Sequence, residues 1–155
     1  MSHFYLDASA VVKRYSPETG SAWIKALVEP PAGHIIVLSE MTLAEVAAAL
    51  AAKHRAPRGI TRGERDRALG LFLSHCDATY ELIALSRRII DRAVKLTQNH
   101  KLRGYDAVQL ATALITNEAL TAASLPPLTF VAADDDLVGA ADTEGLATVN
   151  PNRYS

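Results

Sequence analysis

Cysteine is nearly absent from this sequence of 155 residues, which contains only Cys76. One cysteine cannot form a disulfide within the chain, and without a second cysteine nearby there is no CxxC metal motif. We therefore interpret Cys76 as a buried apolar residue in a reducing compartment. Zinc is also disfavoured, because no HExxH motif occurs and the five histidines show no metal-ligand spacing.

Long apolar runs and an excess of one charge sign are absent as well. No run approaches the roughly 20 apolar residues of a membrane-spanning helix, and the first residues lack the basic start and apolar stretch of a signal peptide. We therefore expect a soluble cytoplasmic protein with no membrane partner. The formal net charge of −1 gives no general attraction to nucleic acid, so a polyanion would have to be held by a local basic patch or by bound metal.

Apolar residues make up 49% of the chain, which is enough for one packed core, and no internal repeat divides it. We predict a single domain over residues 1–155. Short apolar segments predict strands at residues 4–6, 35–38, 80–85, 128–132 and 146–149. Capping residues and apolar spacing predict helices at residues 8–15, 16–28, 39–50, 61–76, 86–99, 104–123 and 134–145.

Strands that alternate with helices indicate a parallel sheet covered on both faces. The predicted fold class is therefore α/β, a three-layer α/β/α sandwich with a central, mostly parallel sheet. In such folds ligands bind beyond the carboxyl ends of the strands, where the strand order reverses. Residues that directly follow a strand are the first candidates for a functional site.

Two aspartates occupy such positions. Asp7 follows the first predicted strand, and Asp134 follows the fourth strand and its closing alanines. Each could simply cap the helix that comes next, since aspartate is a favoured N-cap. If the two strands are adjacent, both carboxylates project into the same crevice.

Two further carboxylates lie on predicted helices. Glu45 has only uncharged neighbours three and four positions away, and a carboxylate on such a face must be paired, protonated or bound to a cation unless it is simply exposed. Asp106 lies in the first turn of an otherwise apolar helix, where the helix dipole favours its ionised form. Complementing that dipole could be its only role.

Together, the four carboxylates favour a metal site. Converging carboxylates repel one another and their pKa values rise unless a cation intervenes. Ligand sets made only of oxygen select hard divalent ions such as Mg²⁺ or Mn²⁺. We predict that the metal ligands, and with them the catalytic residues, are Asp7, Glu45, Asp106 and Asp134.

The segments around these carboxylates resemble, in order and spacing, the acidic motifs of the PIN-domain family. Residues 4–13 are similar to the first motif, in which an aspartate ends strand one and a serine or threonine follows two residues later. Residues 42–46 and 105–113 resemble the second and third motifs, and residues 130–137 resemble the fourth. The resemblance covers essentially the whole chain, whose length is typical of VapC-type toxins.

The resemblance implies metal-dependent endoribonuclease activity, a homodimer, and a type II toxin–antitoxin system in which a VapB-type antitoxin inserts a segment near the site. A metal-activated water would attack the RNA phosphodiester in line. Ser9 would orient Asp7 or a ligating water, or else help to cap the following helix. Asp136 would assist as an auxiliary acid, or else would simply face solvent near the helix start. Glu40 is a weaker contender for the second acidic position, about 140° from Glu45 on the same helix.

An acidic site repels RNA unless cations flank it. We expect RNA contacts from Lys13, Arg14 and Arg103. Further candidates are Arg55, Arg58, Arg62, Arg65 and Lys101. For every one of these cations, the first three included, the simpler interpretation is a solvated surface charge. The sequence does not indicate which RNA is cut, because single strands and loops are recognised by shape and stacking.

Two alternatives remain open. A haloacid-dehalogenase-like phosphatase also ends its first strand with aspartate, but it usually has a second aspartate two residues later, where this chain has Ser9. It also has a lysine before its late acids, and residues 121–134 contain none. The other alternative is an inactive PIN-like interaction module, which the presence of all four carboxylates disfavours.

Overall fold

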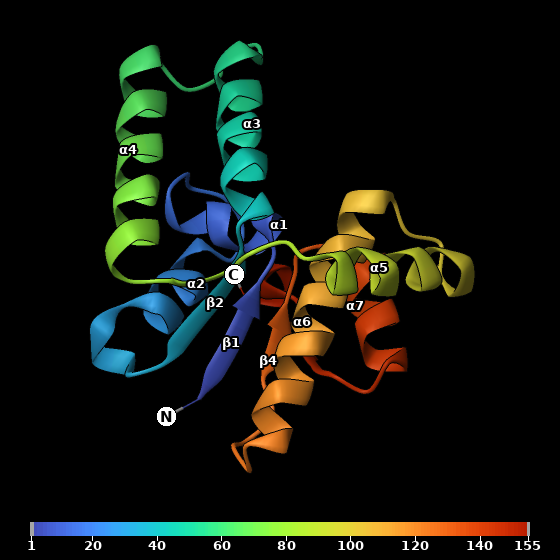
Figure 1. Cartoon of the computed structure of the whole chain (residues 1–155). Coiled ribbons are helices and arrows are strands. Elements are labelled where there is room, and N and C mark those ends of the chain that lie inside the picture. Colours follow the sequence, from blue (N-terminus) through green and yellow to red (C-terminus); the bar gives the residue numbers. More distant parts are fainter. Residues whose placement is uncertain (1, 155) are drawn as a thin grey trace.

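The structure is a computed structural model that describes residues 2–154 (Figure 1). Its strands are β1 (His3–Leu6), β2 (Ile35–Ser39), β3 (Glu81–Ile83), β4 (Thr129–Val131) and β5 (Ala147–Val149). Its helices are α1 (Ala8–Val11), α2 (Ser21–Val28), α3 (Met41–Arg55), α4 (Arg62–Ala78), α5 (Arg87–Asn99), α6 (Gly104–Ala122) and α7 (Asp135–Thr143). Short 3₁₀ turns are η1 (Val12–Arg14), η2 (Pro30–Ala32) and η3 (Pro151–Arg153).

The five strands form one parallel sheet in the order β3-β2-β1-β4-β5. β1 is central, and Tyr5 lies in register with Val37 of β2 and Phe130 of β4. The chain crosses from β1 to β2 on one side and returns to β4 on the other, so the strand order reverses beside β1. The predicted site therefore lies where open α/β sheets bind ligands.

Side-chain alternation along the strands gives each face of the sheet its own core. Tyr5 and Phe130 stack at 5.6 Å between ring centroids on the face covered by α5, α6 and α7. Leu6 and Val131 point to the opposite face, which α1, α2, α3 and α4 cover. These layers confirm the three-layer α/β/α prediction and the five predicted strands.

The α3–α4 hairpin extends beyond the two covering layers (Figure 1). α4 begins with the predicted capping box, in which the Thr61 hydroxyl and the Glu64 carboxylate each accept from the other residue's backbone N–H. In the connecting loop, the Gly59 N–H donates to the Ala56 carbonyl. A Cβ on Gly59 would lie 1.9 Å from the Lys53 carbonyl oxygen, so only glycine fits this turn.

One predicted helix start was wrong. The helix expected from residue 16 begins at Ser21, after Gly20 in a left-handed conformation with φ 87°. Glu18 was expected in its first turn, but its carboxylate instead binds Lys13 and Lys53. The helix expected from Ser39 begins at Met41, although Ser39 Oγ still accepts from the Met41 N–H at 3.2 Å.

No helix within residues 2–154 is both long and apolar enough to cross a membrane.

Candidate acidic active site

Asp7 lies at the carboxyl end of β1 and is only 4% exposed. Its Oδ1 accepts hydrogen bonds from Ser9 Oγ at 2.7 Å and from the Ala10 N–H at 3.1 Å, so it does cap α1. Burial raises the pKa of Asp7 to about 7; these two hydrogen bonds oppose the rise, and the charges of Glu45 and Asp106 add to it. An ionised Asp7 is therefore costly unless a cation compensates its charge.

Glu45 is half-buried on α3 and is held by the amide of Gln109 on α6. Gln109 Nε2 donates to Glu45 Oε1 at 2.6 Å and to Thr42 Oγ1 at 2.9 Å. Burial raises the pKa of Glu45, the Gln109 hydrogen bond lowers it, and the charge of Asp106 raises it again. The Glu45 carboxylate is thus fixed in orientation and faces another carboxylate.

Asp106 and Asp134 lie at the amino-terminal ends of α6 and α7. Burial and the charge of Asp134 raise the pKa of Asp106, and Arg103 opposes the rise. Asp134 is the N-cap of α7, where its Oδ1 accepts from the Asp136 N–H at 2.9 Å and from the Leu137 N–H at 3.3 Å. Capping leaves Oδ2 of Asp134 without a hydrogen bond within the described residues.

The four carboxylates lie at the end of β1, on α3, on α6 and at the start of α7, and the charge of Asp106 interacts with each of the other three or is influenced by it. The charges of Glu45 and Asp106 raise the pKa of Asp7, and the charge of Asp134 raises that of Asp106. β1 and β4 are adjacent, which meets the condition for Asp7 and Asp134 to share one crevice.

Within residues 2–154, no group of three or more histidine, cysteine, aspartate or glutamate side chains lies close enough to hold a metal ion without movement. Each of three carboxylates directs one oxygen toward a protein donor: Asp7 toward Ser9, Glu45 toward Gln109 and Asp134 toward the Asp136 N–H. The donor chemistry nevertheless suits a hard divalent cation, since every candidate ligand atom is a carboxylate oxygen. Raised pKa values also mean that a cation would relieve an existing electrostatic cost.

A cleft of about 360 Å³ opens beside Asp106 and Asp134. Asp136, the predicted auxiliary acid, lines the same cleft. Lys101 and Arg103, from the α5–α6 connection, also line it. The cleft therefore combines acidic side chains with cations, as a site for a phosphate ester and a metal requires.

Ser9 connects the ends of β1 and β4. Its Oγ donates to Asp7 Oδ1 and accepts from the Ala133 N–H at 2.9 Å. This placement suits the predicted orienting role toward Asp7 and goes beyond simple capping. Glu40, the alternative second acid, is exposed at the N-cap position of α3, one residue before the helix that carries Glu45.

The predicted cationic residues have different surroundings. The Lys13 side chain is only 4% exposed, and its Nζ lies 2.7 Å from Glu18 Oε1. Lys13 therefore cannot offer RNA an exposed charge, and this expectation was wrong because Glu18 already neutralises it. Arg14 is partly buried and donates to Tyr80 Oη at 2.9 Å. Only Arg103 of the three lines the cleft beside Asp106.

Sequence reasoning missed Gln109, which is 1% exposed. It accepts from Tyr5 Oη at 2.6 Å while donating to Glu45, and so links the sheet core to the site. The one signal in the sequence was a lone amide three residues after Asp106 in an apolar helix. A buried amide needs hydrogen-bond partners. An amide three residues after a candidate metal ligand lies on the same face of the helix, so its partners are expected in the site.

The fold and these side chains define a three-layer α/β/α protein with an acidic site at the carboxyl edge of a parallel sheet. The PIN domain family model matches residues 4–141, and the chain belongs to the PIN-domain family.

The chain is similar to two curated proteins of Mycobacterium tuberculosis, Ribonuclease VapC45 and Ribonuclease VapC49. Each is 36% identical to it over 114 residues, and the match covers 74% of this chain and 76% of the relative.

Solved structures share the fold at lower identity. A toxin–antitoxin complex from Klebsiella pneumoniae superposes with a TM-score of 0.62 and 21% identity, covering 96% of this chain and 97% of that one. VapC20 of Mycobacterium tuberculosis, described as a sarcin-ricin-loop-cleaving toxin, superposes with a TM-score of 0.61 and 16% identity, covering 96% and 99%.

Proposed function

We propose that this protein is a metal-dependent endoribonuclease that hydrolyses RNA phosphodiester bonds as the toxin of a type II toxin–antitoxin system. The observation that carries the proposal is a set of carboxylates whose charges act pairwise on one another, beside a cleft lined by Asp106, Asp134 and two exposed cations. Membership in the PIN-domain family and similarity to VapC ribonucleases support the same reaction.

The residues that would hold Mg²⁺ or Mn²⁺ are Asp7, Glu45, Asp106 and Asp134. When bound, such an ion lowers the pKa of a coordinated water and neutralises charge on the phosphate. One of these carboxylates would take up the proton released by the attacking water, and Asp106 lines the cleft. Ser9 keeps Asp7 oriented, and Arg103 attracts the phosphate to the cleft.

The proposed partners follow from the same family. A toxin–antitoxin complex among the similar structures supports a VapB-type antitoxin as the inhibitor of this chain. We further propose a homodimer of single-domain subunits, acting on RNA in the cytoplasm.

The phosphatase alternative is weaker in the folded protein. Ser9, where that chemistry usually has a second aspartate, is hydrogen-bonded to Asp7 and to the Ala133 N–H. An interaction-only module remains distinguishable by experiment, since it would bind metal or RNA without cleaving.

The deciding experiment incubates antitoxin-free protein and a pool of structured RNAs with Mg²⁺, with Mn²⁺ and with EDTA. We expect cleavage that requires metal, is lost in Asp7→Asn and Asp106→Asn, and persists in Glu40→Gln, an exposed acid at the start of the helix that carries Glu45. Cleavage that survives EDTA or Asp7→Asn would contradict the proposal. Folded, metal-binding protein that cleaves nothing would support the interaction module.

A further inference from the structure

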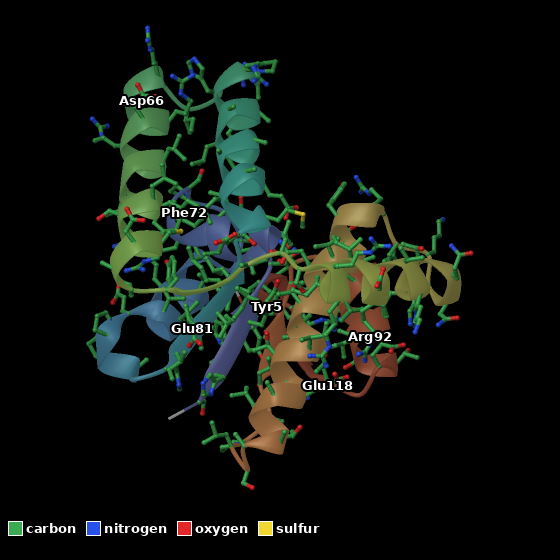
Figure 2. All side chains as sticks on the ribbon, viewed as in Figure 1. Tyr5, Asp66, Phe72, Glu81, Arg92 and Glu118 are labelled. Atoms are coloured by element: carbon green, nitrogen blue, oxygen red, sulfur yellow. The ribbon has the colours of Figure 1, made fainter. Side chains whose placement is uncertain are left out.

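The free end of the α3–α4 hairpin is one of two strongly basic stretches of the chain, the other being residues 87–103. Residues 53–67 contain six of the sixteen lysines and arginines but only two of the seventeen acids, in a chain whose net charge is −1. Figure 2 shows nitrogen-tipped side chains gathered at this end, around Asp66. Six cations thus lie at the hairpin end, in addition to Lys101 and Arg103 in the cleft beside Asp106.

Four of these cations are unpaired in the described part of the chain. Lys53 binds Glu18, and Arg65 binds its neighbour Asp66. The exposed arginines without an ion pair within residues 2–154 are Arg55, Arg58, Arg62 and Arg67. Although Arg67 lies near enough to Glu64 to lower the pKa of that carboxyl, Glu64 is held in the capping box of α4.

Arg58 is held in a conformation that arginine adopts only at a cost. Its φ is 57°, in the left-handed region, where glycine or asparagine is more easily accommodated. The adjoining Gly59 is tightly packed against the Lys53 carbonyl, which fixes the path of the loop. Asparagine or glycine would relieve this strain, so the conformation of the loop does not itself require arginine at this position.

The surface beside this loop is hollowed. A depression of about 450 Å³ lies between the Ser16–Pro17 turn and the loop, and Lys53 and Arg58 line it together with Glu64. Lys53 is paired with Glu18, so Arg58 is the cation that this concave surface offers to a phosphate.

The distance from the acidic site to the hairpin end is one that an extended polyanion can span. α3 carries Glu45 in its second turn and Arg55 at its last residue, about 15 Å further along the helix axis. The hairpin projects from the sheet edge where the site lies (Figure 1). An RNA several nucleotides long that is bound at the site can therefore lie against the hairpin end.

We propose that Arg55, Arg58, Arg62 and Arg67 form a second binding surface for the phosphate backbone of the RNA substrate, separate from the site of cleavage. This inference rests on the proposed ribonuclease function. Arginine suits the role because its planar guanidinium binds phosphate oxygens in pairs. The surface contributes affinity and its salt dependence, while the carboxylates alone determine the chemical step.

The test compares two variants that each lack four of the cations. The hairpin variant combines Arg55→Gln, Arg58→Asn, Arg62→Gln and Arg67→Gln, and the control combines Lys25→Gln, Arg87→Gln, Arg88→Gln and Lys95→Gln at exposed positions on α2 and α5. RNA affinity is measured in the Asp7→Asn background at several salt concentrations. We expect the hairpin variant to bind at least ~10-fold more weakly, with the slope of log K against log salt reduced by about 0.7 for each phosphate that is no longer neutralised.

A control that matches the hairpin variant in slope and affinity would overturn the inference. So would an unchanged affinity accompanied by loss of antitoxin inhibition, which would assign the surface to a protein partner. In active protein, the hairpin variant should raise KM for long RNA and leave cleavage of a four-nucleotide RNA unchanged. If unmodified protein cleaves no RNA at all, the proposed function fails, and this is a separate result.

The single substitution Arg58→Asn distinguishes an effect on RNA binding from an effect on folding. Because asparagine tolerates the left-handed conformation, we expect an unchanged or higher melting temperature together with weaker RNA binding. A lower melting temperature with unchanged RNA binding would make Arg58 a structural residue and contradict the proposal.

Discussion

Gln109 shows how one buried amide can position a reactive carboxylate. Its Nε2 donates to Thr42 and Glu45, and its carbonyl oxygen accepts from Tyr5. All three hydrogen bonds require the same orientation of the Gln109 amide. A fully satisfied buried amide is rigid, because every alternative orientation leaves a polar group without a partner. The position of the Glu45 carboxylate is therefore determined from the core side of the molecule.

Replacing Gln109 by leucine should disturb both the fold and the site. Leucine has a similar size but leaves the Tyr5 hydroxyl and the Glu45 carboxylate without partners, at a cost of about 1–3 kcal/mol in unfolding free energy. We expect Mn²⁺ affinity, measured by calorimetric titration, to fall by roughly tenfold, or about 1.4 kcal/mol. Tyr5→Phe is the matched control, since it removes one bond of the amide and leaves the bond to Glu45.

In Tyr5→Phe, stability should fall while Mn²⁺ affinity stays near that of the unmodified protein. An equal decrease of affinity in both variants would mean that general loosening of the core, and not the hydrogen bond from Gln109 to Glu45, controls metal binding.

The sequence could place the carboxylates near helix starts but could not choose between capping and a shared site. In the structure the two roles coexist, because Asp7 and Asp134 each cap a helix through Oδ1. Gln109 could not have been assigned partners at all, since Tyr5 lies 104 positions away and Glu45 lies 64 positions away. Local patterns carry no information about such pairs.

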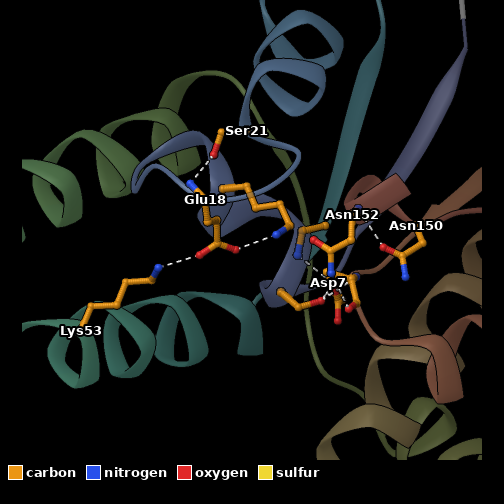
Figure 3. A network of polar contacts seen from close by, with 10 residues as sticks. Asp7, Glu18, Ser21, Lys53, Asn150 and Asn152 are labelled. Atoms are coloured by element: carbon orange, nitrogen blue, oxygen red, sulfur yellow. Dashed lines mark hydrogen bonds and ion pairs between the residues drawn. The ribbon is translucent and has the colours of Figure 1, made fainter. Parts of the chain in front are cut away.

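Among the elements, α2 shows how a tertiary contact overrides a local helix signal. The residues from Ser16 to Glu18 have the composition of a helix start, but Glu18 lies between two lysines from η1 and α3 (Figure 3). Gly20 then makes the turn into α2 with a positive φ and packs against the Pro151 carbonyl. Neither lysine is predictable from the helix signal itself, so the start was placed too early.

Glu18→Gln should destabilise the protein at neutral pH, because it leaves Lys13 buried without a counter-charge. Truncating one partner of a fully buried pair costs about 3–5 kcal/mol, and partial exposure of Glu18 reduces the expected cost to roughly 2 kcal/mol. Lys53→Met, which removes the more exposed partner, should cost under about 1 kcal/mol. Urea unfolding at pH 7 measures the change in unfolding free energy for both variants.

The same ion pair predicts a pH dependence. Burial alone would raise the pKa of Glu18, but hydrogen bonds and charge from Lys13 and Lys53 outweigh it and lower that pKa below 4.5. A lowered folded-state pKa means that the stabilisation is fully present above the unfolded-state value and is lost as pH falls through the folded-state value. The stability difference between Glu18→Gln and the unmodified protein should therefore shrink below about pH 4, and a constant difference down to pH 2 would contradict this assignment.

For the molecule as a whole, the layer architecture was predictable and the strand order was not. Alternating strands and helices require a covered parallel sheet whatever the order of its strands. The adjacency of β1 and β4, which brings Asp7 and Asp134 to the same edge, depends on long-range pairing between Tyr5 and Phe130. The site is thus a consequence of topology, with ligand candidates supplied by both covering layers.

This shared site should make the two layers unfold together. Trp23, the only tryptophan, packs into the core on the α1–α4 side, while far-UV circular dichroism reports on all helices. For one cooperative domain the two melting curves coincide. Mn²⁺ at 100 times its Kd should stabilise the protein by about 2.7 kcal/mol and move both midpoints up together by roughly 5–10 °C, because the ligands come from elements on both faces of the sheet.

Asp106→Asn tests whether repulsion between carboxylates lowers the stability of the metal-free protein. Removing one charge from the cluster should leave the metal-free midpoint unchanged or raise it, while the Mn²⁺-induced shift becomes smaller. A full Mn²⁺ shift in this variant would exclude Asp106 from the metal site. Separate transitions for Trp23 and circular dichroism, with only one moved by Mn²⁺, would show instead that the metal binds within one layer and that the chain is not a single cooperative domain.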